Sequence, residues 1–266
     1  MAAVSWIYLV DESNLAPNAH VRFYVCGAMA LPIDRLPALN EAVRGIRSDC
    51  GYAPEDSLKW QTAGRPAHVS VNQHREAKNR VLELPSDLHL RFFPVLTHHR
   101  VALRRSVQDR VEFAANFAVG LVERFLGEQQ ADAIGLFDRR PAGDEGTYLR
   151  SLFQRQPDNP PGRDFSLKRT TALGYTVDGA SHLASVLDIT LGAFCYCVNE
   201  GDPEHLTVPR RLWPKVLERM WWTESAPGHR TLRPEGFAFL PVRIRTQAVL
   251  DERSAAIDHL NELLPG

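Results

Sequence analysis

The stretch SWIYLVDES, at residues 5–13, carries the clearest indication of the fold. Its uninterrupted apolar run at residues 6–10 is typical of a strand that is covered on both faces. Asp11 and Glu12 follow directly, and the alternation of side chains along a strand puts Asp11 on the same face as Leu9. A carboxylate on an apolar face is costly unless it is paired or bound to a cation. This stretch therefore predicts a two-sided sheet with an unusual acid at the end of one strand.

The rest of the chain predicts a mixed α/β protein. The first two strands read as a hairpin around a polar turn at residues 14–20. Helices are interspersed with strands and no period repeats, which favours an α/β (α+β mixed sheet) fold with residues 201–266 as a C-terminal, largely helical elaboration packed on the same domain. We expect strands at 5–10, 21–31, 88–96, 131–138, 165–177 and 237–244, and helices at 33–50, 73–84, 106–128, 147–156, 180–198, 212–222 and from about 248 onward.

Composition excludes several classes of protein. The 31 Lys and Arg against 32 Asp and Glu give a net charge of −1, so there is no global basic field for coating nucleic acid or membranes. The start of the chain lacks a basic region, and no uncharged stretch approaches the length of a membrane span. The 4 cysteines lack zinc-ligand spacing and read as buried free thiols. We therefore expect a cytoplasmic protein with no membrane partner.

Two more acids stand in positions as unusual as that of Asp11. Asp138 closes the strand at 131–138, and Asp188 lies on an apolar helix among small and apolar neighbours. If the three aspartates converge at the carboxyl edge of a sheet, their oxygen-only set favours Mg²⁺ or Mn²⁺ over zinc. Such ions activate water and stabilise the leaving oxygen of a phosphodiester. The alternative is that Asp11 and Asp138 only form turns or cap helices.

Five short motifs follow one another along the chain: YLVDES at 8–13, FYVCGAMAL at 23–31, SLKW at 57–60, LFD at 136–138 and HLASVLDITLGAF at 182–194. In this order they resemble the DUF3800 family, which is predicted to have a ribonuclease H-like fold. The resemblance implies a ribonuclease H-like domain over residues 1–200, with Asp11, Asp138 and Asp188 as the catalytic metal ligands. It adds Glu12 as a neighbouring metal ligand and Lys59 as a catalytic, phosphate-binding residue. An exposed turn acid and a solvated loop lysine remain the alternatives for these two.

The motifs depart from the family pattern at two places. Ser57 stands where the family has a glutamate, although Asp56 and Glu55 lie next to it and are potential replacements. The usual glutamine of the last motif is also missing, and Ser185 lies closest to its place. These changes suggest either a divergent branch or a weakened site.

Basic and aromatic residues supply the expected partners. Arg139 and Arg140 follow Asp138 directly and are expected to contact substrate phosphate at the rim of the site, so DNA or RNA is the expected partner. The segment with Trp213, Trp221 and Trp222 has the spacing of a packed helix or a subunit interface, which makes a homo-oligomer one expectation.

Two hypotheses for function follow from these residues. The first is a Mg²⁺- or Mn²⁺-dependent nuclease or phosphodiesterase. The second is a non-enzymatic binding or assembly protein that keeps the fold but has lost activity, as the missing glutamate and glutamine suggest. Fold-level analogy alone does not decide between them.

Overall fold

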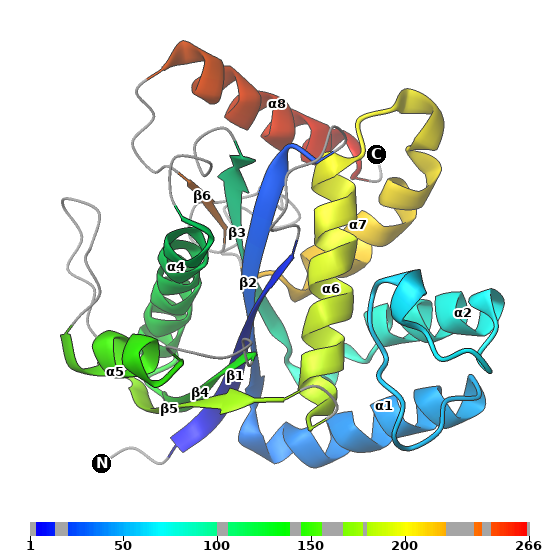
Figure 1. Ribbon diagram of the computed structural model, residues 1–266, viewed down its shortest axis with the longest axis horizontal. Helices are drawn as coiled ribbons and strands as arrows, with labels where there is room; N and C mark the ends of the chain where they lie inside the picture. Colours follow the sequence, from blue (N-terminus) through cyan, green and yellow to red (C-terminus); the bar gives the residue numbers. More distant parts are fainter. Residues whose placement is uncertain are drawn as a thin grey trace.

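The computed structural model describes residues 4–13, 21–99, 106–138, 145–155, 167–177, 180–221, 237–240 and 246–264 (Figure 1). Its strands form a six-stranded sheet in the order β5-β4-β1-β2-β3-β6. The strands β1, β2 and β3 are antiparallel neighbours, whereas β4, β5 and β6 pair in parallel with β1, β4 and β3 respectively. The predicted mixed α/β sheet and its opening hairpin are confirmed. The strands are β1 Val4–Ser13, β2 Phe23–Pro32, β3 Arg91–His98, β4 Asp132–Asp138, β5 Thr170–Thr176 and β6 Ala238–Leu240.

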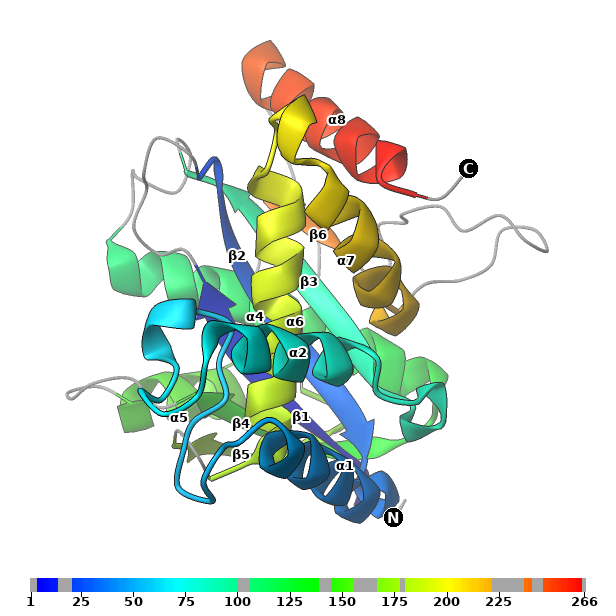
Figure 2. The ribbon, with the colours of Figure 1, turned by 90° about the vertical axis from the view of Figure 1, so that its right-hand side faces the viewer.

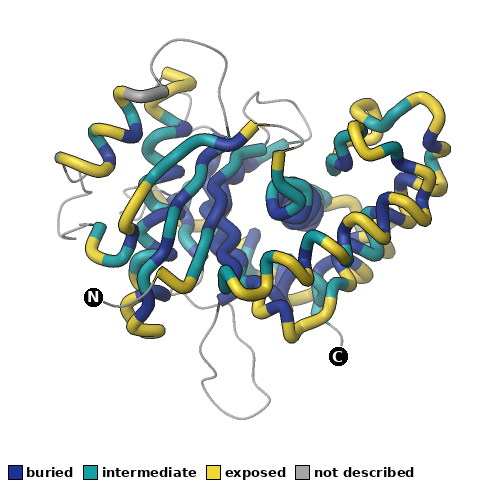
Figure 3. Tube along the Cα trace, turned by 90° about the horizontal axis from the view of Figure 1, so that it is seen from below, coloured by how far each residue is buried: buried dark blue, intermediate teal, exposed yellow. Residues whose placement is uncertain are grey.

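Helices cover both faces of this sheet. In Figures 1 and 2, α4 and α5 lie on one face, and α6 lies on the other with α1, α2 and α7 around it. Buried residues run through the sheet and the central helix in Figure 3, while the outer turns of the peripheral helices are exposed. The helices are α1 Leu36–Asp49, α2 Val71–Leu82, α4 Val107–Glu128, α5 Glu145–Arg155, α6 His182–Asn199, α7 Thr207–Arg219 and α8 Gln247–Glu262.

The strand β2 separates two hydrophobic cores. All its residues except the last are buried. Alternate residues such as Val25 belong to the core that contains α6, whereas their neighbours such as Cys26 belong to the core that contains α4. A strand that is buried on both faces needs apolar side chains at nearly every position. This requirement explains the continuous apolar runs from which the sheet was predicted.

The helix α6 is the centre of the larger core. By length and composition it is the one helix in the described part of the chain that could cross a membrane. However, 67% of it is buried inside the structure, and the buried core helix of a globular protein meets the same criteria. It packs against β1 and β2 on one side and against α7 on the other. Its apolar character is therefore accounted for by its place in the core.

Most bounds shift by a few residues, and two elements differ most from the sequence prediction. The helix expected at 212–222 is α7, which begins earlier, at Thr207, and ends earlier, at Arg219. Pro214 lies inside this helix, so tertiary packing overrides the tendency of proline to interrupt a helix. The strand expected at 165–177 begins only at Thr170, because the Glu123 carboxylate accepts the backbone N–H groups of Lys168, Arg169 and Thr170.

Two tryptophans of the C-terminal segment, Trp213 and Trp221, lie inside the chain's own core. Trp213 is 0% and Trp221 is 6% exposed, and Trp222 lies outside the described residues. The same segment adds β6 to the sheet edge beside β3 and packs α7 and α8 on α6. A homo-oligomer through this segment stays a prediction.

The segment between α1 and the SLKW motif contains a tight turn and is held by a buried arginine, Arg47. The helix ends at Asp49, and Gly51 has a φ of 80°, a left-handed conformation that glycine adopts readily just after the end of a helix. The Arg47 guanidinium is buried and donates hydrogen bonds to the carbonyl groups of Ala53, Pro54 and Asp56. These contacts hold the loop that carries Lys59.

The end of α6 is tied to the start of β2 by one side chain. The Asn199 Oδ1 atom accepts the backbone N–H groups of Arg22 at 2.8 Å and Phe23 at 3.0 Å. The Asn199 Nδ2 atom donates to the Cys195 carbonyl at 2.9 Å.

We expect Asn199→Ala to lower the free energy of unfolding by about 1–3 kcal/mol, because it leaves partly buried backbone N–H groups without an acceptor. Asn199→Asp keeps the acceptor and should lose less. Urea denaturation of both variants measures this, and a wild-type midpoint for Asn199→Ala would contradict it.

Candidate functional site

Two of the predicted acids end neighbouring parallel strands. The register of β1 and β4 pairs Val10 with Phe137, so the next residues, Asp11 and Asp138, stand side by side at the carboxyl edge. The residues two places before them, Leu9 and Leu136, pack in the core that contains α6. Because side chains alternate along a strand, both aspartates face α6.

The third predicted acid comes from α6 itself. Asp188 lines one small pocket together with Asp11 and Asp138, and Ser57 and Lys59 also line it. The pocket has a volume of about 20 Å³, which is room for about one water molecule or a small ion. The fold thus brings the three aspartates and the predicted lysine together from two strands, a helix and a loop. We call this the acid pocket.

Burial and like charge dominate the electrostatics of the acid pocket. Removal from water raises the pKa of Asp11 well above its usual range, and the charges of Glu12, Asp138 and, more weakly, Asp188 raise it further. The Glu12 backbone N–H donates to Asp11 Oδ1 at 2.7 Å and offsets part of this rise in pKa. A carboxylate in such surroundings is stabilised by a nearby cation.

A second lysine at this site was missed by the sequence analysis. The Lys78 Nζ atom, on α2, donates to the Trp60 carbonyl at 2.9 Å and lies 4.4 Å from the centre of the indole ring. Burial and, secondarily, the charge of Arg75 lower the pKa of Lys78, whereas the charge of Asp188 raises it. No local pattern marks Lys78, because α2 meets Trp60 only in the folded chain.

The spacing between Asp188 and Gly192 has a clear structural reason. The Trp60 backbone N–H donates to Asp188 Oδ2 at 2.5 Å. One turn later, a Cβ atom at Gly192 would lie only 2.1 Å from the Trp60 Cγ atom. The aspartate therefore holds the backbone of the 57–61 segment, and the glycine leaves room for its indole side chain.

The two potential replacements for the missing glutamate, Asp56 and Glu55, are not among the residues that line the acid pocket. The Asp56 Oδ2 atom accepts the Ala53 backbone N–H at 2.6 Å and lies 3.0 Å from the His68 Nε2 atom, while Glu55 is exposed. Ser57 itself faces the acid pocket. Asp56 thus has partners within its own loop, and a replacement role for Asp56 or Glu55 stays a prediction.

The remaining predicted residues have different positions. Glu12 follows Asp11 on β1, so alternation turns its side chain toward the opposite face of the sheet, although its charge still raises the pKa of Asp11. Ser185 lines the acid pocket. Arg139 and Arg140 lie outside the described residues.

The acid pocket offers oxygen donors but no finished ligand shell. Carboxylate oxygens are the donors that Mg²⁺ and Mn²⁺ prefer. In the described part of the chain, no three His, Cys, Asp or Glu side chains are arranged so that they could hold a metal ion. Two of the carboxylate oxygens, on Asp11 and Asp188, accept backbone N–H groups. The donor chemistry fits a divalent ion, and the side chains would have to draw together to bind it.

Comparison of the chain with models of known protein families finds no matching family. A comparison with curated proteins finds no similar sequence either. The functional interpretation therefore rests on the residues and geometry of the acid pocket.

We expect Gly192→Ala to displace Trp60 and to lower the free energy of unfolding by about 1–3 kcal/mol, the usual cost of overpacking. Gly127→Ala is the matched control, since it also adds one methyl group to a helix but meets no atom within 4 Å. Urea denaturation and tryptophan fluorescence compare the two variants. Equal effects would contradict the close contact of Gly192 with Trp60.

We expect Asp11→Asn to stabilise the metal-free protein at pH values above the ordinary pKa of an aspartate, because the pKa of Asp11 is raised in the folded state. A carboxyl group whose folded-state pKa exceeds its unfolded value binds a proton on folding, so its contribution falls as pH rises from the unfolded pKa through the folded one. Asparagine carries no titratable carboxyl group, so the variant does not lose free energy of unfolding in this way as pH rises. Each 1 kcal/mol of added unfolding free energy raises Tm by about 2–4 °C.

Thermal melts in EDTA at pH 4 and pH 8 measure this pH dependence. The Tm difference between Asp11→Asn and the wild type should be larger at pH 8. The exposed Asp87, changed to Asn, serves as the control. A difference that is independent of pH would rule out the raised pKa.

Proposed function

We propose that this protein is a metal-dependent phosphodiesterase of the nuclease type. The observation that carries the proposal is the convergence of Asp11, Asp138 and Asp188 in one pocket of about 20 Å³. Stability alone does not account for this cluster, because each carboxylate raises the cost of charging its neighbours. Strongly perturbed acids that cluster in a cleft are typical of functional sites.

Each residue has a role in this proposal. Asp11, Asp138 and Asp188 would hold Mg²⁺ or Mn²⁺, with Glu12 adding negative charge nearby. When bound, the ion supplies Lewis-acid activation of water and stabilises charge on the leaving oxygen. Lys59, which lines the same pocket, would contact a phosphate oxygen of the substrate. We also propose that Arg139 and Arg140, which follow Asp138 in sequence, contact flanking phosphates.

The proposal extends to the fold family. Two aspartates at the ends of neighbouring parallel strands and a third on the covering helix form the arrangement that the resemblance to the DUF3800 family implies. The antiparallel hairpin that opens the sheet supports a ribonuclease H-like core over residues 1–200. The family and this finer fold assignment are parts of the proposal.

One observation favours the alternative, a non-enzymatic binding or assembly protein. The described residues do not form a three-ligand metal set, and Ser57 stands in place of an acid. Titration of the protein with Mn²⁺ by calorimetry separates the two functions. Binding that is lost in Asp188→Asn supports the metal-dependent enzyme, and no binding supports the alternative.

We expect the purified protein to cleave a labelled DNA or RNA oligonucleotide with Mg²⁺ or Mn²⁺ and to be inactive in EDTA. Asp11→Asn and Asp188→Asn should each lower the rate at least about a hundredfold, the loss typical when one electrostatic stabiliser of a transition state is removed. Gel electrophoresis of the products measures the rates.

Asp87→Asn is the matched control, because it neutralises an exposed aspartate outside the acid pocket. It should cleave at the wild-type rate. Cleavage that survives both Asp11→Asn and Asp188→Asn would show that the active site lies elsewhere.

A further inference from the structure

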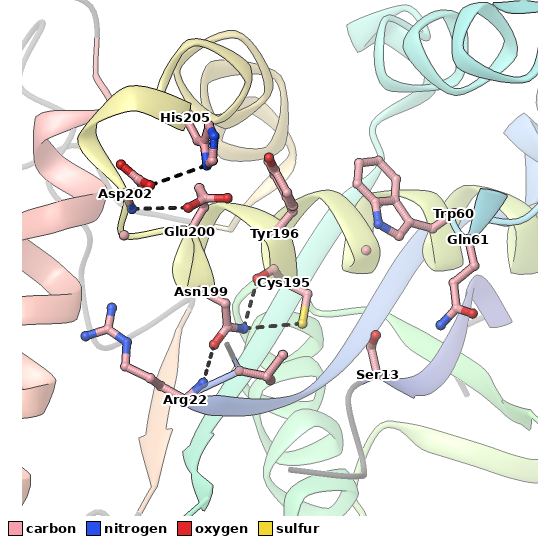
Figure 4. Close-up of a pocket in the computed structure, with 13 residues that line it drawn as sticks. Ser13, Arg22, Trp60, Gln61, Cys195, Tyr196, Asn199, Glu200, Asp202 and His205 are labelled. Atoms are coloured by element: carbon pink, nitrogen blue, oxygen red, sulfur yellow. Dashed lines mark hydrogen bonds and ion pairs between the residues drawn. The ribbon is translucent and has the colours of Figure 1, made fainter. Parts of the chain in front are cut away.

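Figure 4 shows a larger cleft, which is lined by residues that neighbour those of the acid pocket along the chain. It has a volume of about 690 Å³, within the usual range of small-molecule sites. The same three elements line both spaces, with residues only a few positions apart. The strand β1 contributes Asp11 to the acid pocket and Ser13 to the cleft, and α6 contributes Asp188 to the pocket and Gly192 to the cleft.

The 57–61 segment divides the two spaces. Lys59 lines the acid pocket, whereas Trp60 and Gln61 line the cleft. Trp60 is a fixed wall, since its backbone is bonded to Asp188 and Lys78, its Cβ and Cγ atoms lie close over Gly192, and Lys78 lies over its ring. A wall that is already ordered adds little entropy cost when a ligand binds.

The two ends of the cleft differ in chemistry. Figure 4 shows Trp60, Gln61 and Ser13 at one end, Tyr196 along the middle, and Glu200 and Asp202 at the other end. The Tyr196 ring, with an amide on Gln61 and a hydroxyl on Ser13 in the same cleft, is suited to a flat ring that carries hydrogen-bonding edges, and Trp60 closes the end of the cleft. Arg22 and His205 lie at the same end as these carboxylates, and His205 Nδ1 is 3.6 Å from Asp202 Oδ2, so the charges there are mixed.

We infer that this cleft binds the base of the nucleotide next to the phosphate that lies at the acid pocket. The substrate is then single-stranded nucleic acid, because a base that is paired in a duplex cannot enter the cleft. This inference rests on the proposed function, and it assigns the phosphate to the side of Lys59 and the base to the side of Tyr196.

Fluorescence anisotropy with labelled single-stranded DNA and RNA tests the inference. Binding is measured in the Asp11→Asn background, where the proposed chemistry is blocked and one negative charge is removed. A second probe has the same length and phosphates but abasic sites in place of bases. Tyr196→Ala should weaken binding of the base-containing probe about tenfold, the usual effect of removing one stacking partner. It should leave binding of the abasic probe unchanged.

The controls separate ring stacking from misfolding. Tyr196→Phe keeps the ring and should bind both probes as the parent does. Phe153→Ala removes an aromatic side chain that is 50% exposed on α5 and should also have no effect. Gln61 is exposed, so Gln61→Ala should fold normally and weaken only the base-containing probe. The better of the DNA and RNA probes identifies the type of nucleic acid.

The outcomes of the two proposals are distinguishable. If Tyr196→Ala and Gln61→Ala bind the base-containing probe as the parent does, or lose both probes equally, the base subsite is wrong even when Asp11-dependent cleavage is found. If the wild type cleaves nothing while these variants selectively lose the base-containing probe, the enzyme proposal is wrong and the base subsite holds.

Discussion

Negative charge crowded at the carboxyl ends of β1 and β4 is the constraint on which the rest of the site depends. Parallel pairing places Asp11 beside Asp138, and the packing of α6 on the same face adds Asp188. Burial and mutual repulsion raise the pKa of Asp11, so this corner opposes folding when its acids are ionised. The two cores on either side of β2 supply the stability that offsets it. Functional sites commonly lower the stability of the folded protein in this way.

The 57–61 segment converts this corner of the sheet into two distinct spaces. Arg47 holds the loop that precedes it, and Asp188 accepts the backbone N–H of Trp60. Asp188 thus has a structural contact as well as its proposed ligand role, which connects the acid pocket to the neighbouring cleft. A substitution at Arg47 or Asp188 is expected to alter the shape of both the acid pocket and the cleft, because the 57–61 segment forms a wall of each.

Much of the fold was predictable because it depends on local patterns. Apolar runs identified β1 and β2, and helical spacing identified α4 and α6. The predictions failed where a distant group overrode the local pattern. The Glu123 carboxylate accepts backbone N–H groups ahead of β5. The helix α7, which packs on α6, begins at Thr207, several residues before the predicted start at 212.

The unusual positions of Asp11, Asp138 and Asp188 follow from the amino-acid sequence alone, because the apolar residues next to each acid along the chain predict its burial. The surroundings of these acids depend on the folded chain: Lys78 lies near Asp188, Asp56 turns toward His68, and a cleft lies behind Trp60. These contacts join residues that are far apart along the chain or belong to separate elements. Their approach depends on how the sheet, α2 and α6 pack, and periodicity along the chain carries no information about that packing.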